Sequence, residues 1–421
     1  ELRFAAEMVS DPAYFRDYGL SDKDRLDSHL VVSRTRAGEH IGARLVHVHS
    51  IRSGEVNATL PQLSADMGWV RRVAVPGVGG TATLAFDLHA HRRASDSDII
   101  GRDMARATLA AFWRRDWVGP AGVLAALEAG ATMDLHRISQ DSGWPGHVRT
   151  VTPAALVELR WPWARVDARG TADVIEPVVQ VVWSRPTPAG HVPNEDSTLV
   201  EFDEGNLFGF NRFAGADRRE GGARVNAGVQ WTRSTASGWH TVASAGRVFR
   251  LTGAGQFTAA SGLGGRRSDW MATLHLAGPQ GAVFQGRAVF DDRLHLARGE
   301  MRMAVERDRF GLAAGWLWAE ADVAENRLTN TAEWVADGRL RLAQNWSARG
   351  SARYDFEARR ATAAAVGLEF ANECLRVDLT VSRRFTTSTT VAPTTDFGLS
   401  VDLLGFGGSR AAGPAGKACR N

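Results

Sequence analysis

The 421-residue sequence predicts an all-β fold, a large antiparallel transmembrane β-barrel of the outer-membrane type. Apolar and polar residues alternate along many short segments, as expected when successive strand side chains point to opposite faces of a sheet. Turn-forming residues separate these segments, and a strand with its connection takes about 20 residues, which gives roughly 18–22 strands. Most of the 14 tryptophans lie near segment ends, as the aromatic girdles of a membrane barrel would.

The alternation can be followed from one end of the chain to the other. Each segment has one apolar and one polar face, and we expect the apolar faces to contact lipid and the polar faces to line a water-filled lumen. The residues assigned to the lipid side are Leu84, Phe86, Val377 and Leu379, and those assigned to the lumen are Asp87, His89, Arg376 and Asp378. The clearest segments are residues 2–8, 81–91, 121–134, 225–231, 376–382 and 396–403.

A single domain accounts for the alternating region. The sequence contains no linker, no shift in composition and no fixed-length repeat, so the barrel should cover residues 1–406. Residues 396–406 are expected to be the last strand and the barrel-assembly signal. Residues 407–421 are rich in Gly and Ala and should form a loose periplasmic C-terminal tail.

The bulk composition is compatible with this fold, although it resembles that of a soluble protein. Mean hydropathy is −0.21, and no run approaches the roughly 18–20 apolar residues of a membrane helix, but strand alternation hides a barrel from hydropathy. A soluble β-sandwich also alternates, yet it usually has only about 7–9 strands. Arginine is spread evenly and the net charge is only +3, which argues against nucleic-acid binding.

The motifs expected for catalysis or for a cofactor are missing. Residues 262–265 are Gly-rich but lack the Lys-Ser/Thr of a phosphate loop, and no G-x-S-x-G elbow is present. His47 with His49, and His89 with His91, share strand faces and could chelate a metal, but no third ligand accompanies them in a clear motif. We therefore predict no enzyme activity, no metal and no cofactor. A porin-like passive channel and a soluble β-rich binding or enzymatic domain remain the alternatives.

The most informative stretch is residues 176–231, where two strand-like runs flank a long loop. Loops of this length inside a compact protein are uncommon and are usually functional or disordered. This loop holds four phenylalanines, which disorder would not favour, so we expect it to fold back against the barrel interior or rim. Arg212 could hold it there by pairing with Asp203 or Asp217. The most distinctive loop residues are Asn206, Leu207, Phe208, Asn211, Arg212, Phe213, Gly215, Asp217 and Arg218.

The loop resembles the outer-membrane barrel domain of the LPS-assembly family LptD. Residues 206–208 read N-L-F, and residues 211–218 read N-R-F-A-G-A-D-R where the family has N-R-F-S-G-x-D-R. The second block is the specific part of the resemblance. Weaker matches extend it over most of residues 9–406, at residues 9–15, 60–63, 101–120, 176–180, 372–375, 382–385 and 395–399.

The resemblance implies a function. The family barrel is larger than the strands counted here, and lipopolysaccharide leaves it sideways, through a weak seam between the first and last strands, into the outer leaflet of the outer membrane of a Gram-negative bacterium. The implied partners are lipopolysaccharide, outer-membrane lipid, an LptE-type lipoprotein that plugs the lumen, and a periplasmic bridge protein that acts through an N-terminal periplasmic domain. We expect this sequence to lack that domain and the first few strands.

Cys374 is a candidate disulfide cysteine. It follows a turn signal and directly precedes the alternating residues 375–381, so it should lie at a strand end. In the family, cysteines at this place bond to the N-terminal periplasmic domain, and the resemblance makes this end periplasmic, where disulfides persist. Cys419 in the tail is the candidate partner within this chain, and a buried free thiol is the alternative.

Overall fold

In the part of the chain that the structure describes, the strands form one antiparallel sheet of 21 members, which confirms the predicted fold class and strand number. The computed structural model describes residues 1–11, 14, 21, 23–52, 54–187, 190–385 and 393–403. No helix in these ranges is long and apolar enough to cross a membrane. In chain order the strands are β1 (Leu2–Ala5), β2 (Arg25–Arg36), β3 (Glu39–Ser50), β4 (Leu63–Ala74), β5 (Thr81–Arg92), β6 (Asp103–Val118), β7 (Leu124–Ser139), β8 (His147–Arg160), β9 (Trp163–Val166), β10 (Ala172–Ser184), β11 (Gly222–Ser234), β12 (His240–Arg250), β13 (Trp270–Ala277), β14 (Val283–Phe290), β15 (Leu296–Glu306), β16 (Phe310–Ala319), β17 (Thr331–Arg341), β18 (Trp346–Asp355), β19 (Arg360–Ala371), β20 (Leu375–Arg384) and β21 (Thr395–Leu403).

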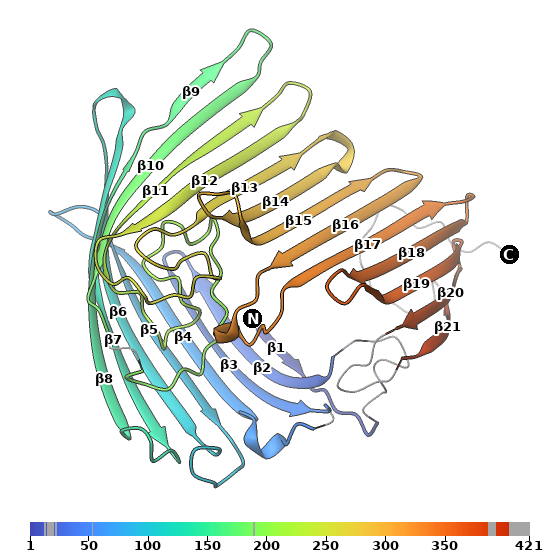
Figure 1. Cartoon of the computed structure of the whole chain (residues 1–421), viewed down its shortest axis with the longest axis horizontal. Helices are drawn as coiled ribbons and strands as arrows, with labels where there is room; N and C mark the ends of the chain where they lie inside the picture. The colour runs from blue at the N-terminus through green and yellow to red at the C-terminus, as the bar shows by residue number, and fades with distance from the viewer. Residues whose placement is uncertain are drawn as a thin grey trace.

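The sheet is a meander in which each strand pairs with the next along the chain. The exception is β9, which continues the line of β8 after Trp161 and Pro162, so that both pair with β10. A proline has no N–H to give to a sheet ladder, which accounts for the break. The sheet curves around a hollow, and β1 and β21 are its two edges in the part of the chain that the structure describes (Figure 1).

The two ends of the sheet differ in the length of their connections. At one end, called the turn end here, short connections such as residues 37–38, 278–282 and 372–374 join the strands. At the other, called the loop end, the connections include residues 185–221 and 251–269. Both of these long segments turn back into the hollow of the sheet (Figure 1).

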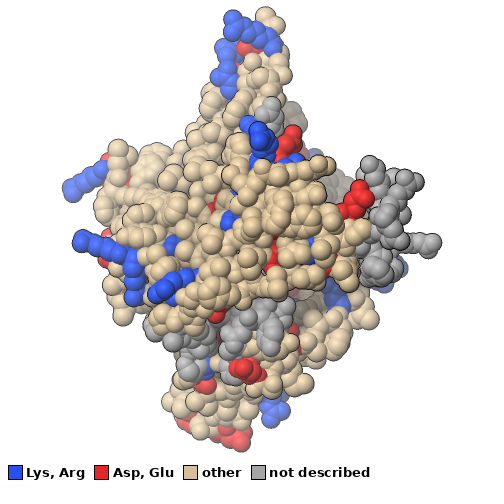
Figure 2. Space-filling view, turned by 90° about the vertical axis from the view of Figure 1, so that its right-hand side faces the viewer, with Lys and Arg blue, Asp and Glu red and all other residues tan. Residues whose placement is uncertain are grey.

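The outer face of the sheet is apolar, as the alternation predicts. Leu379 is 50% exposed, and it pairs with Leu368 of the neighbouring strand, so that apolar side chains lie side by side on that face. Trp346 and Phe370 pack with ring centroids 5.1 Å apart near the turn end, as part of an aromatic girdle. Figure 2 shows a broad uncharged surface, with Lys and Arg gathered at the projecting top, the region where β9 and β10 lie in Figure 1.

Three predicted segment bounds need adjustment. The strand expected over residues 2–8 ends at Ala5, because beyond it Glu7 contacts Asp27 and Ser28 through side-chain hydrogen bonds instead of the backbone ladder. The stretch expected as a strand from residue 121 begins at Leu124, because Ala121 and Gly122 adopt positive φ in the preceding turn. The last strand was expected over residues 396–406, and the structure gives β21 as Thr395–Leu403. Residues 404–406, and the tail predicted at 407–421, lie outside the described residues, so the tail remains a prediction.

Candidate functional site

The two long loops form a compact plug with its own apolar core. We define the plug as residues 185–187, 190–221 and 251–269. Phe213 of the first loop stacks on Phe257 of the second, with ring centroids 4.3 Å apart. Strands β12 to β15 contribute the wall side of this core, whose buried members are Val200, Phe202, Leu207, Phe213, Val248, Phe257, Leu263, Met271, Val289 and Ala297. The plug therefore has the dry interior of a small folded unit.

Leu207 packs against a region of the barrel wall where two glycines leave no side chains. Gly228 of β11 pairs directly with Gly246 of β12, and a Cβ placed on Gly228 would lie 3.1 Å from Leu207 Cδ2. A Cβ on Gly246 would overlap the same methyl group, so only glycine leaves room for it. Gly228 is six residues along β11 from Gly222, which places this contact about 20 Å from the loop end of the strand.

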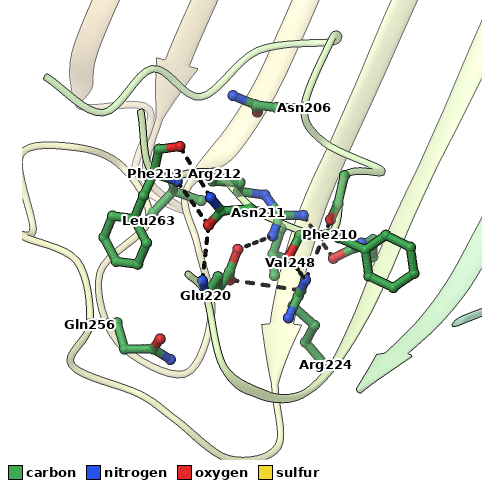
Figure 3. A network of polar contacts seen from close by, with 12 residues as sticks. Asn206, Phe210, Asn211, Arg212, Phe213, Glu220, Arg224, Val248, Gln256 and Leu263 are labelled. Carbon is green, nitrogen blue, oxygen red and sulfur yellow. Dashed lines mark hydrogen bonds and ion pairs between the residues drawn. The ribbon is translucent and has the colours of Figure 1, made fainter. Parts of the chain in front are cut away.

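A buried cluster of charges joins the plug to the wall (Figure 3). Glu220 receives Arg212 at 2.7 Å and Arg250 at 3.1 Å, and Arg224 approaches it at 3.8 Å. All four side chains are at most 2% exposed. Burial alone would raise the pKa of Glu220, but the three guanidinium charges hold this pKa below its usual value, so the carboxylate stays ionised.

The three arginines of this cluster also bind the loop backbone. Arg212 donates to the carbonyl oxygen of Leu207, Arg224 to that of Phe210, and Arg250 to that of Leu263, each at 2.6 Å. The Nε atoms of the three arginines have no hydrogen-bond partner. One carboxylate thus balances three buried cations, and carbonyl dipoles supply the remaining stabilisation.

The prediction that Arg212 pairs with Asp203 or Asp217 was wrong. Arg212 pairs with Glu220 instead of Asp203 or Asp217, because Glu220 lies at the base of the loop beside β11, where the Arg212 side chain points. Asp203 lies 3.7 Å from Arg287 of β14 instead.

Asp217 anchors another part of the plug to β6 and β7. Its carboxylate contacts Arg106, lies 3.7 Å from His136 Nε2, and accepts the Glu195 amide at 2.9 Å. Burial by itself would raise the pKa of Asp217, but the nearby His136, the hydrogen bond from the Glu195 amide and the charge of Arg106 lower this pKa to about 2. Glu195 in turn binds Arg102 at 2.6 Å. This edge of the plug is fixed by charge, in contrast to its apolar centre.

The remaining motif residues shape the loop itself. The Asn211 side chain accepts the Glu220 amide at 2.9 Å and donates to the Arg218 carbonyl at 3.0 Å, which closes a turn. Asn206 caps another turn through Glu201 and Asp203. The Arg218 guanidinium lies 4.0 Å from the centre of the Phe213 ring, Gly215 has a φ of +67°, and Phe208 packs at the edge of the apolar core.

The four polar strand residues singled out by alternation lie in two separate places. Asp87 and His89 line a cavity of about 440 Å³ together with Gly215, Ala216 and Arg219 of the plug. Arg376 and Asp378 lie on β20, where Asp378 pairs with Arg349, and the structure does not bring them to the plug. His89 binds Asp66 at 2.7 Å, and the described residues contain no group of three or more side chains arranged to hold a metal.

Cys374 lies in the turn between β19 and β20, at the turn end of the sheet. Its amide donates to the Asn372 side chain at 2.9 Å. The candidate partner Cys419 lies outside the described residues, so the disulfide remains a prediction.

A curved sheet with an apolar outer face and loops folded into its hollow defines a plugged β-barrel of the outer-membrane class. A family model described as LPS transport system D, LptD, matches residues 1–333, and this chain belongs to the LptD family. The family resemblance and the outer-membrane location inferred from the sequence are thereby confirmed. The family is one of transport barrels and not of enzymes.

Solved structures that resemble the chain are also outer-membrane proteins. They include a mutant of the ferric enterobactin receptor PfeA from Pseudomonas aeruginosa, with 11% identity, 90% of this chain and 69% of that chain covered, and a TM-score of 0.39. The siderophore receptor PirA from the same organism has 10% identity, with 90% of this chain and 68% of that chain covered and a TM-score of 0.39. The ferric citrate transporter FecA has 8% identity, with 91% of this chain and 68% of that chain covered and a TM-score of 0.36. No curated protein matches the chain.

Because the family is one of outer-membrane barrels, the lengths of the connections give the orientation of the sheet in the membrane. Outer-membrane barrels carry short turns on the periplasmic side and longer loops outside. The turn end, with Cys374, therefore faces the periplasm, and the plug is built from extracellular loops that fold inward.

Proposed function

We propose that this chain is the barrel component of a translocon that assembles lipopolysaccharide into the outer leaflet of the outer membrane. The observation that carries the proposal is the plug. Its apolar core and its buried Glu220 cluster fill part of the hollow from the loop end, while the wall beneath keeps arginines such as Arg287 and Arg302. Arginine forks bind phosphate, so an anionic saccharide head can be accommodated below the plug.

A lateral route fits this arrangement better than an axial one. Acyl chains would lose about 25 cal/mol per Å² if they crossed a charged lumen exposed to water, whereas the outer face of the sheet is already apolar. The edges formed by β1 and β21 are the places where a lipid can move from the hollow to the membrane. Every residue of β21 is exposed, which leaves that edge available.

The partners proposed for this barrel follow from the family. An LptE-type lipoprotein would occupy the hollow beside β16 to β20, where the inner wall presents the small side chains of Ala313, Ser351 and Ala365. A periplasmic bridge protein would deliver lipopolysaccharide from the turn end, through an N-terminal periplasmic domain of the kind that the family carries. Outer-membrane lipid surrounds the apolar face.

A depletion experiment tests the function against the porin alternative. Cells in which this protein is depleted should stop presenting newly made lipopolysaccharide at the surface, as measured by surface labelling after a metabolic pulse, and the molecule should accumulate inside. Uptake of small hydrophilic solutes is the parallel measurement. Unchanged surface lipopolysaccharide together with reduced solute uptake would refute the proposal and support a passive channel.

A further inference from the structure

A second cavity lies under the plug, on the inner wall formed by β11 to β15. Its volume is about 560 Å³, and Glu204 is the plug residue that lines it. Besides Gln230 and Arg287, six of its wall residues carry hydrogen-bonding side chains. They are Ser244, Thr273, His275, Gln285, Glu300 and Arg302.

These six side chains make no hydrogen bond or ion pair with any other described residue. In the plug the charged groups are paired, as Glu220 is with Arg212. Farther along the inner wall, Arg339 pairs with Glu306 and Asp378 with Arg349. Polar groups without protein partners are bound to water or to a ligand, and here they converge from four neighbouring strands on one cavity.

The cavity also contains a cation that the plug holds only loosely. Arg287 of β14 binds both carboxylate oxygens of Glu204 at 3.2 Å and lies 3.7 Å from Asp203. The Glu204 side chain is 48% exposed, so water reaches this pair, and a competing anion can displace the carboxylate. Arg302 offers a second guanidinium on the next strand.

We propose that this cavity is a binding site for a phosphorylated saccharide. Arg287 and Arg302 bind the phosphate, and the uncharged side chains of Ser244, Thr273 and Gln285 exchange hydrogen bonds with sugar hydroxyls. The Glu300 carboxylate accepts hydrogen bonds from sugar hydroxyls, and its negative charge disfavours simple inorganic anions. The proposed function enters only as the source of such a ligand, because lipopolysaccharide has a phosphate-bearing saccharide head.

Binding at this site is coupled to the plug. Phosphate on Arg287 takes the place of Glu204 and Asp203, which belong to the same plug segment as Leu207. The ligand thereby removes one of the contacts that tie the plug to the wall. The Glu204→Gln variant removes that contact without the ligand, so it should bind the ligand more tightly than the native protein.

The test uses the full chain purified in detergent and saturation-transfer NMR with three probes, glucosamine 6-phosphate, glucosamine and inorganic phosphate. Glucosamine 6-phosphate should bind about tenfold more tightly than either part, and Arg302→Gln should weaken it about tenfold through loss of charge-assisted hydrogen bonds. Thr273→Val combined with Gln285→Leu should weaken the sugar phosphate but not inorganic phosphate. Arg339→Gln is the matched control, since it removes an inner-wall arginine outside the cavity and should change nothing.

Two results would overturn the site. One is equal binding of inorganic phosphate and glucosamine 6-phosphate, which would leave a phosphate site with no saccharide specificity. The other is undiminished binding in a folded Arg302→Gln protein, with folding checked by heat-modifiable migration on a gel. Because this experiment involves no transport, intact sugar-phosphate binding in a protein that fails the depletion test would refute the proposed function and leave the site standing.

Discussion

Replacing Glu220 with Gln tests whether the buried charge cluster holds the plug in place. The substitution keeps the shape of the side chain, so it creates no cavity and changes only the charge. It leaves Arg212, Arg224 and Arg250 at most 2% exposed with no counter-charge between them. Because the neighbouring arginines keep the Glu220 pKa below its usual value, the native carboxylate is ionised at neutral pH and the comparison is one of charge against no charge.

The expected effect is large. Removing one partner of a buried ion pair costs about 3–5 kcal/mol, and this cost falls on the docked state of the plug. At 1.4 kcal/mol per factor of ten, opening of the plug should become about a hundredfold to a few thousandfold more frequent. Glu204→Gln is the matched control in the same loop, since its pair with Arg287 is exposed and should contribute only about 0–1 kcal/mol.

Amide hydrogen exchange of the purified barrel measures this directly. Amides in residues 206–220 should lose protection in Glu220→Gln by the factor given above, while amides in the strands of the wall should not change. In cells, the same variant should admit large hydrophilic antibiotics that the native protein excludes. Equal protection in Glu220→Gln and Glu204→Gln would refute the assignment of the plug's stability to this cluster.

Three further predictions address the seat of the plug, its pH dependence and the lipid face. Gly246→Leu should displace Leu207 and expose residues 206–213 to exchange, without loss of the barrel strands. The pKa of Asp217 is lowered to about 2 from 3.8, so the ionised carboxylate stabilises the docked plug by about 2 kcal/mol. This stabilisation is complete above pH 4 and disappears as the pH falls towards 2. Asp217→Asn should abolish this pH dependence of amide exchange in the plug. Leu379→Arg should impair insertion by about 2–4 kcal/mol in a heat-modifiability assay, whereas Arg376→Leu, on the polar face, should insert normally.

The local sequence pattern was sufficient to predict the strands of the sheet and the faces of their side chains. A period of two in hydrophobicity specifies which side chains share a face, and that holds for any strand regardless of its neighbours. The alternation at residues 376–382 therefore located β20 to within two residues. The four phenylalanines of the long loop indicated a packed segment, because apolar side chains are buried whichever surface receives them.

The tertiary structure alone decided which groups meet inside the hollow. Arg212 was expected to find Asp203 or Asp217, yet its partner is Glu220, and Arg250 reaches the same carboxylate from a different strand. The contact of Leu207 with Gly228 and Gly246 could not be predicted from the sequence either, because a glycine in a strand usually indicates a weakened strand or a bend. Hydrophobic periodicity is fixed by neighbours two residues apart, whereas ion pairs and close contacts depend on strand register and loop path, which exist only when the whole sheet is assembled.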